Sequence, residues 1–210
     1  KTHPPLSWWV WNQSTGYIKH QRHYHPLSHL PYLSHILLAN SNRLEENSGG
    51  KMLFKGSQEE TDEREEAFPE LWDEYPQYLV QLLTHSKCKD VVFFAVKAIR
   101  NRVDKADLID VNAVVQLLQK GYAWAVNLGL EVARGKYDPS NPNAILVLAL
   151  LKSQNEEAIQ LALQWMEEKA VYFSQEISFV CDLFLVENPV ARDWLKRNIQ
   201  ESNYTDRQGN

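Results

Sequence analysis

Cysteine is scarce in this chain: Cys88 and Cys181 are the only two, which is too few for a framework of disulfides. Long apolar runs are lacking too, because the longest, Ala144–Leu151, has eight residues against the roughly 20 that span a bilayer. No charged and then apolar leader is visible at the start, so we expect no secretory signal. Together these absences predict free thiols, no membrane contact and a cytoplasmic location.

Motifs of common catalytic chemistry are absent as well. The sequence has no glycine-rich phosphate loop, no dinucleotide-binding glycine motif, no Gly-x-Ser-x-Gly elbow and no His-Glu-x-x-His helix. Beyond residue 66, His85 is the only imidazole, which leaves little material there for acid–base catalysis. We therefore predict that the chain is not an enzyme and uses no cofactor.

What is present is an ordinary composition for a globular chain of 210 residues, with 44% hydrophobic and 23% charged residues. This length suits one domain, or one domain with an appendage. The net charge of −5 is unevenly spread, since residues 1–58 carry +4, residues 59–74 carry −8 and residues 75–210 carry −1. The balance argues against a surface that is basic throughout, although a local basic patch stays open.

Apolar residues recur at a nearly constant spacing in the last two thirds of the chain. The apolar pairs, at steps of 35, 33 and 33 residues, are Leu82-Leu83, Leu117-Leu118, Leu150-Leu151 and Leu183-Phe184. Each pair is followed by a set of positions spaced i, i+3, i+4, i+7, which share one face of a helix. These sets begin at Val91, Ala125, Ala158 and Ala191. The pattern predicts an all-α fold, an α-solenoid of about four helical hairpins. A helical bundle with accidental periodicity is the alternative.

These patterns divide the chain into an aromatic and His-rich cap or docking segment (1–58), an acidic linker (59–66), a helical-repeat domain (67–199) and a polar tail (200–210). We expect the first segment to be irregular apart from a short helix near Pro31–Asn40. The six acidic residues of the linker should repel one another and stay solvated. Cys181, which lies among apolar neighbours, is expected in the core.

The first repeat unit reads Phe68-Pro-Glu-Leu-Trp-Asp73, followed by Leu82-Leu83 and Phe94-Ala95. A leucine pair in one helix and a small residue midway along the next resembles short HEAT or armadillo-type repeats. The unit also looks like helical-repeat segments of large bacterial multidomain proteins, some of which carry WGR domains. The resemblance covers residues 67–199 and implies a bacterial helical-repeat fold, which by itself does not decide function.

Two groups of residues are candidates for binding a partner. In the N-terminal segment they are aromatic and basic, and in the repeats they occupy equivalent places in three successive units. They are Trp8, Trp9, Trp11, Arg22 and Tyr24, and then Arg102, Lys136 and Lys169. The first group suits capping of the repeats, docking to a protein, or stacking of bases. The second group would form a basic row, or would simply complement the carboxyl ends of three helices.

The imidazoles of the N-terminal segment raise the question of a metal site, formed by His20, His23, His25 and His29. No cysteine joins them, and Pro26 interrupts any helix that would gather His25 and His29 on one face. Metal binding is therefore the less favoured interpretation. Our main hypothesis is a non-enzymatic scaffold or adaptor for another protein or larger complex. The alternative is an accessory subunit that binds nucleic acid.

Overall fold

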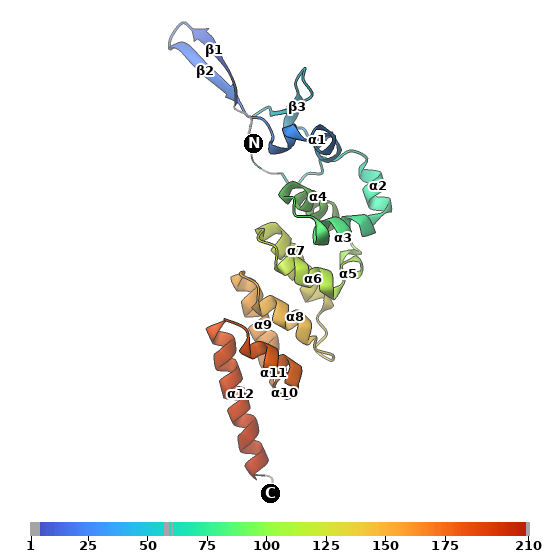
Figure 1. The fold of residues 1–210 in the computed structure, drawn as a ribbon, viewed down its shortest axis with the longest axis vertical. Coiled ribbons are helices and arrows are strands. Elements are labelled where there is room, and N and C mark those ends of the chain that lie inside the picture. Colours follow the sequence, from blue (N-terminus) through green and yellow to red (C-terminus); the bar gives the residue numbers. More distant parts are fainter. Residues whose placement is uncertain (1–4, 57–58, 60, 209–210) are drawn as a thin grey trace. The chain divides into compact units, whose positions relative to one another are not determined.

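The computed structural model describes residues 5–56, 59 and 61–208. This part of the chain is mostly helical, with twelve α-helices and two small antiparallel sheets (Figure 1). Among its helices, none combines the length and the apolar character needed to cross a membrane. The chain forms two compact units, one of residues 1–79 and 86–99 and the other of residues 80–85 and 100–210.

The first unit begins with a β-hairpin, where we expected irregular structure. Strand β1 (Leu6–Asn12) pairs antiparallel with β2 (Gly16–Arg22). The turn is built by Asn12, whose side-chain oxygen accepts a hydrogen bond from the Ser14 amide at 2.9 Å, and by Gly16, whose φ of 76° suits glycine. The expectation of an all-α chain is therefore wrong for this segment, because its tryptophans and Val10 favour a strand.

The rest of the N-terminal segment is a small mixed structure. It contains the 3-10 helix η1 (Pro26–His29), the expected short helix α1 (Pro31–Leu38), and a second hairpin of β3 (Leu44–Glu46) and β4 (Met52–Phe54). Its buried apolar side chains are Leu27, Leu37, Leu38, Leu44, Met52, Leu53 and Phe54. The segment thus has a core of its own and is more than a loose arm.

Helix α2 (Pro69–Glu74) and helix α4 (Lys89–Arg100) follow in the first unit, and helix α3 (Pro76–His85) is shared between the two units. Residues 89–99 of α4 cluster with the N-terminal segment. Val92, Phe94, Ala95, Ala98 and Ile99 of this helix are buried.

Among its described residues, the second unit has helices as its only regular secondary structure. Its further helices are α5 (Lys105–Leu108), α6 (Val111–Leu118), α7 (Ala123–Lys136), α8 (Ala144–Leu151), α9 (Glu156–Glu168), α10 (Ala170–Gln175), α11 (Ile177–Phe184) and α12 (Pro189–Gln208). The side chains of Asp110, Asn143 and Asn155 cap α6, α8 and α9 by accepting a backbone N–H. Because α12 runs to Gln208, most of the predicted tail 200–210 is helical, and residues 209–210 lie outside the described part.

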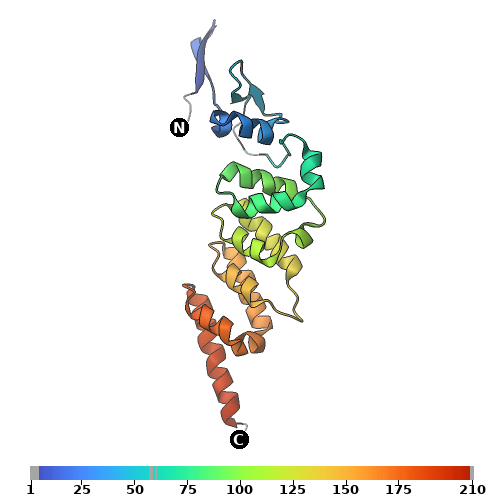
Figure 2. The ribbon, with the colours of Figure 1, turned by 45° about the vertical axis from the view of Figure 1, so that its right-hand side comes forward.

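Helix packing in this unit follows the order of the chain. Helix α6 contacts α7 and α8, and α8 contacts α9 and α11, as both ribbon views show (Figures 1 and 2). At the α6–α7 contact, a Cβ on Gly129 would lie only 3.2 Å from the Cβ of Leu117, so glycine allows the close approach. The predicted pairs Leu117-Leu118 and Leu150-Leu151 are buried. In the last pair, Leu183 is buried but Phe184 is exposed.

Candidate functional site

The β1–β2 hairpin presents aromatic side chains on both of its faces. On one face Trp8 lies between two neighbours: its ring stacks on His20, with centroids 5.5 Å apart and planes inclined by 15°, and Arg22 Cζ lies 5.7 Å from its centroid. Arg22 in turn forms an ion pair with Glu45. This face is therefore partly covered by its own residues, and Trp8 is 38% exposed.

The opposite face is open. Trp9, Trp11 and Tyr17 are 63%, 61% and 68% exposed, and the Trp11 and Tyr17 rings meet edge to face at 5.0 Å. Lys19 is paired directly with Trp9 across the two strands. We call these four residues the hairpin surface. Tyr17 and Lys19 complete it beside the candidates Trp9 and Trp11.

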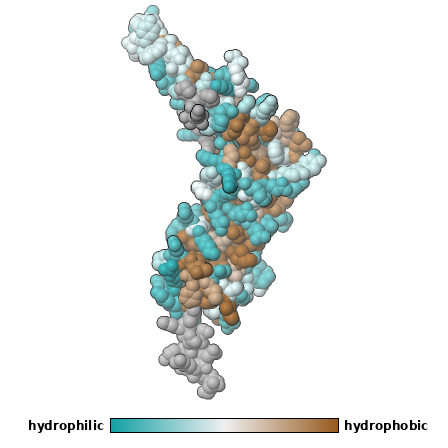
Figure 3. Space-filling view, in the orientation of Figure 1, coloured by the Kyte–Doolittle hydropathy of each residue, from teal (hydrophilic) through white to brown (hydrophobic). Residues whose placement is uncertain are grey.

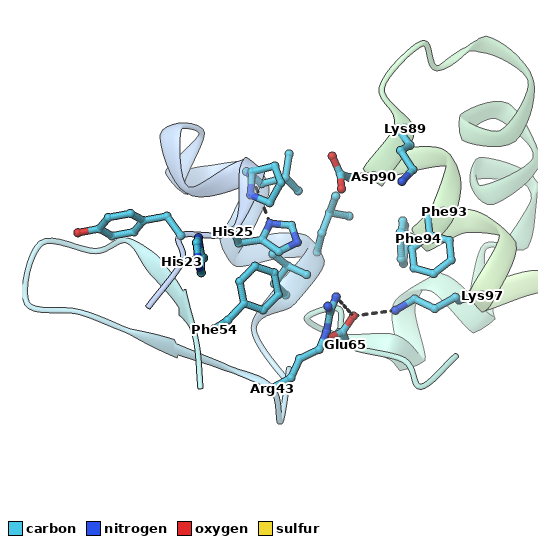
Figure 4. Close-up of a pocket in the computed structure, with 15 residues that line it drawn as sticks. His23, His25, Arg43, Phe54, Glu65, Lys89, Asp90, Phe93, Phe94 and Lys97 are labelled. Carbon is cyan, nitrogen blue, oxygen red and sulfur yellow. Dashed lines mark hydrogen bonds and ion pairs between the residues drawn. The ribbon is translucent and has the colours of Figure 1, made fainter. Parts of the chain in front are cut away.

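Tyr24 lies apart from the hairpin surface. It follows β2, forms an isolated bridge with Leu53, and is half-buried with Lys51 Nζ 5.7 Å from its ring centroid. Tyr24 is one of the residues that line a cavity of about 430 Å³ in the first unit, and other residues around this cavity are labelled in Figure 4. The structure thus divides the N-terminal candidates between an exposed hairpin and a cavity.

A buried ion network forms one side of this cavity. Glu65 lies between Arg43 and Lys97 (Figure 4), with Arg43 Nε 2.7 Å from Oε1 and Lys97 Nζ 2.8 Å from Oε2. Each cation also lies over a phenylalanine ring, Arg43 over Phe54 and Lys97 over Phe93. Burial by itself would raise the pKa of Glu65, but hydrogen bonds from Arg43, Lys97 and Ser41 outweigh it and lower that pKa to about 2.

This network changes our interpretation of the acidic segment. Glu65 and Glu66 are buried, and Glu66 forms an ion pair with Arg64. We expected all six acidic residues of the linker to stay solvated, which is wrong for these two. Glu60 lies outside the described residues. Since Glu65 joins Arg43 of the N-terminal segment to Lys97 of α4, the end of the acidic segment acts as a clamp inside the first unit.

His25 lines the same cavity but is held as a structural group. Its Nδ1 accepts a hydrogen bond from the Leu27 amide at 3.2 Å, and its ring lies 5.4 Å from that of Phe54. Burial lowers the pKa of His25 below its ordinary value of 6.5, while the nearby charge of Asp90 opposes this change. The imidazole is therefore neutral at pH 7.

The four candidate metal ligands lie in different surroundings. His20 stacks on Trp8 in the hairpin, His25 is buried, and His23 and His29 are exposed. Nowhere in the described part of the chain do three His, Cys, Asp or Glu side chains form a group that could hold a metal ion. The cavity is lined by no Ser, Thr or Cys, and its central carboxylate is fully engaged by neighbouring donors. These contacts make Glu65 a structural group.

The predicted basic row starts with a residue that is already paired. Arg102 Nε and Nη2 each donate to Asp104 at 2.9 Å. Lys136 ends α7 and Lys169 is the C-cap of α9, both half-buried. Both lysines therefore lie where the partial negative charge at the end of a helix favours a cation.

Apolar surface is visible at several places on the face drawn in Figure 3, and the exposed apolar residues of the second unit include some of helix α11. Ile177, Val180, Cys181 and Phe184 have the spacing of one helix face; Ile177 and Phe184 are 77% and 62% exposed, and Val180 is half-buried. Cys181 is exposed too, so its predicted place in the core is wrong. We call these four residues the α11 stripe. Phe179 and Leu183, on the inner face of the same helix, are buried.

Apolar residues occupy more of the circumference of α11 than the fold buries. The helical periodicity of the sequence therefore did not predict which of them would be exposed. Alternation missed the hairpin in a similar way, since aromatic residues occupy both faces. In the sequence, the residues of both surfaces other than Lys19 can be identified as aromatic or apolar. No local pattern shows that the other elements of the fold leave them uncovered. Comparison of the chain with models of protein families, with curated proteins and with solved structures found no match.

Proposed function

We propose that this chain is a non-enzymatic interaction module, a scaffold or adaptor for a protein partner, built from HEAT-like helical repeats. The observation that carries the proposal is the α11 stripe. Contiguous exposed apolar residues on a folded domain mark sites of interaction, because water is released when a partner covers them. A helix of the partner, packed along α11 by its own apolar face, is the simplest element that would cover it.

The helical array is the support for this surface. In the second unit the first helices of successive pairs, α6, α8 and α11, contact one another in sequence order. Their apolar pairs recur every 33 residues from Leu117 onward. Such stacking favours an α-solenoid, in which each hairpin buries its apolar face only against its neighbours. In this arrangement the buried residues hold α11 rigid while its other face stays available.

The function is tested by capture of partners from a lysate of the source organism, with the tagged full chain. The variant Ile177→Ser/Phe184→Ser removes apolar area from the stripe. Val103→Ser serves as the control because Val103 is a fully exposed apolar residue of the second unit outside the stripe. We expect a defined protein that survives nuclease treatment, and at least about a tenfold loss of it with the double variant alone.

Two results would contradict the proposal. One is equal recovery of the same proteins by the wild type, the control and the double variant. The other is a capture in which every recovered protein disappears with nuclease. Because both substituted side chains are exposed, the thermal melting of the double variant should match that of the wild type within about 2 °C. This control separates loss of binding from loss of folding.

A further inference from the structure

The hairpin surface presents three large aromatic rings that nothing in the described chain covers. Every residue of β1 is exposed, and β1 and β2 pair only with each other. Trp9 and Trp11 lie two residues apart on one face, about 7 Å along the strand, and Tyr17 is paired with Trp11 on β2. The three rings thus lie on one face of two neighbouring strands and form a platform, in which the Trp11 and Tyr17 ring planes are inclined by 66°.

The charged side chains of the hairpin are all basic. From Pro5 to Arg22 the sequence contains no acidic residue, although the whole chain has a net charge of −5. Arg22 is paired with Glu45 and supports Trp8 from the other face, whereas Lys19 is exposed beside Trp9. A partner that complements this surface therefore carries negative charge and has planar groups that can stack on the three aromatic rings.

We propose that the hairpin surface binds single-stranded nucleic acid. Unpaired bases stack on Trp9, Trp11 and Tyr17, and Lys19 neutralises a neighbouring phosphate. Proteins bind single strands by this combination of aromatic platforms and cations, and the exposed face of a sheet is a common place for it. An acidic protein segment would satisfy Lys19 but would not supply successive planar rings. This binding is independent of the α11 stripe and of the protein partner proposed for it.

The other face of the hairpin stiffens the platform. Trp8 is held between His20 and Arg22, and Arg22 is tied to Glu45 of β3. Two isolated strands are marginally stable in water, so these contacts help to keep β1 and β2 paired when the platform is empty. The hairpin then needs little rearrangement on binding. Less of the free energy of stacking is therefore lost to ordering the protein.

The test is a titration of fluorescently labelled oligouridylate and oligothymidylate, each about twenty nucleotides long, with the full chain at about 50 mM salt. Anisotropy reports binding, and a duplex of the same length is the comparison. We expect micromolar or tighter binding of at least one single strand, weaker binding of the duplex, and quenching of tryptophan fluorescence. RNA and DNA are distinguished by the two oligonucleotides.

Two variants with matched controls locate the site. Trp9→Ala/Trp11→Ala should weaken binding by about tenfold or more, whereas Tyr32→Ala, which removes an exposed ring of α1, should leave it unchanged. Lys19→Glu should weaken binding and reduce the slope of log K against log salt by about 0.7. Lys196→Glu, the same charge change in the second unit, should alter neither.

The proposal is overturned if the wild type binds neither strand at about 100 μM, if duplex and single strands bind equally, or if Tyr32→Ala and Lys196→Glu are as damaging as the hairpin variants. Should the double alanine variant lose its hairpin, Lys19→Glu and Trp9→Phe/Trp11→Phe still decide the question. The phenylalanine variant retains two stacking rings, so it should keep most of the affinity. Ile177→Ser/Phe184→Ser should bind the strands like the wild type.

Discussion

At the scale of single residues, the buried charged groups of the first unit are stabilised by ion pairs and hydrogen bonds with their neighbours. Glu65 and Lys97 are buried charges that persist because each has several partners, including Arg43 and the carbonyl oxygen of Glu63. A buried ion pair contributes little beyond a well-packed apolar pair, but removal of one partner leaves a charge without compensation. These residues therefore act as structural groups whose loss is costly.

Lys97→Met tests this clamp. The methionine keeps an apolar side chain near Phe93 but leaves Glu65 with one cation fewer, so we expect a loss of about 3 kcal/mol in the free energy of unfolding. Lys87→Met, at an exposed lysine that precedes α4, should change it by less than about 0.5 kcal/mol. Chemical denaturation followed by circular dichroism measures both. Equal stability of the two variants would show that Lys97 is not a structural group.

The same unit should lose stability in two steps as the pH falls. His25 has a folded pKa below 6.5, so the unfolded chain binds its proton first and stability decreases once the pH drops below about 6.5. Glu65 titrates near 4.5 when unfolded and about 2 when folded, so its contribution is present above 4.5 and is lost between these values. Melting temperatures between pH 7 and pH 3 measure this. His25→Gln should remove the first step alone, and an unchanged first step would contradict the assignment.

At the scale of secondary-structure elements, the helices are set by apolar spacing and by polar caps. Helix α8 shows this most clearly, because Leu150 is fully buried while Ile145 on the same helix is exposed. The helix lies between α6 and α11 and also contacts α9. A charge on its inner face would therefore disturb several neighbours at once.

Leu150→Asp should unfold much of the second unit, with a loss of at least about 4 kcal/mol, since it places an unpaired charge between packed helices. Ile145→Asp makes the same substitution on the exposed face and should cost less than about 1 kcal/mol. Urea denaturation of both variants measures the difference. Similar stabilities would mean that α8 does not contribute a buried face to the array.

The sequence predicts helices better than it predicts surfaces. The pairs Leu117-Leu118 and Leu150-Leu151 lie in α6 and α8, and the sets that begin at Ala125 and Ala158 lie in α7 and α9, because apolar spacing and capping residues act locally. The hairpin was missed because its two aromatic faces hide the alternation that marks a half-buried strand. The burial of Glu65 and the exposure of Cys181 depend on contacts with other elements, which no local pattern contains.

At the scale of the whole molecule, each compact unit presents one candidate surface of its own. The first unit carries the hairpin surface, which has aromatic rings and no acidic residue, and the second carries the apolar α11 stripe. The two surfaces differ in chemistry and therefore suit different partners. On the two proposals made above, the chain would bring a protein and a single-stranded nucleic acid together.

The α11 stripe supplies its own probe for the most direct test of this account. With Cys88 replaced by serine, a photoreactive maleimide attached to Cys181 lies within the stripe, whereas attachment to Cys88 in a Cys181→Ser chain places the same probe outside it. After illumination in lysate of the source organism, we predict a protein adduct that resists nuclease and forms from Cys181 alone. No protein adduct at Cys181, or the same adducts from both positions, would contradict the role of α11 as the protein-binding surface.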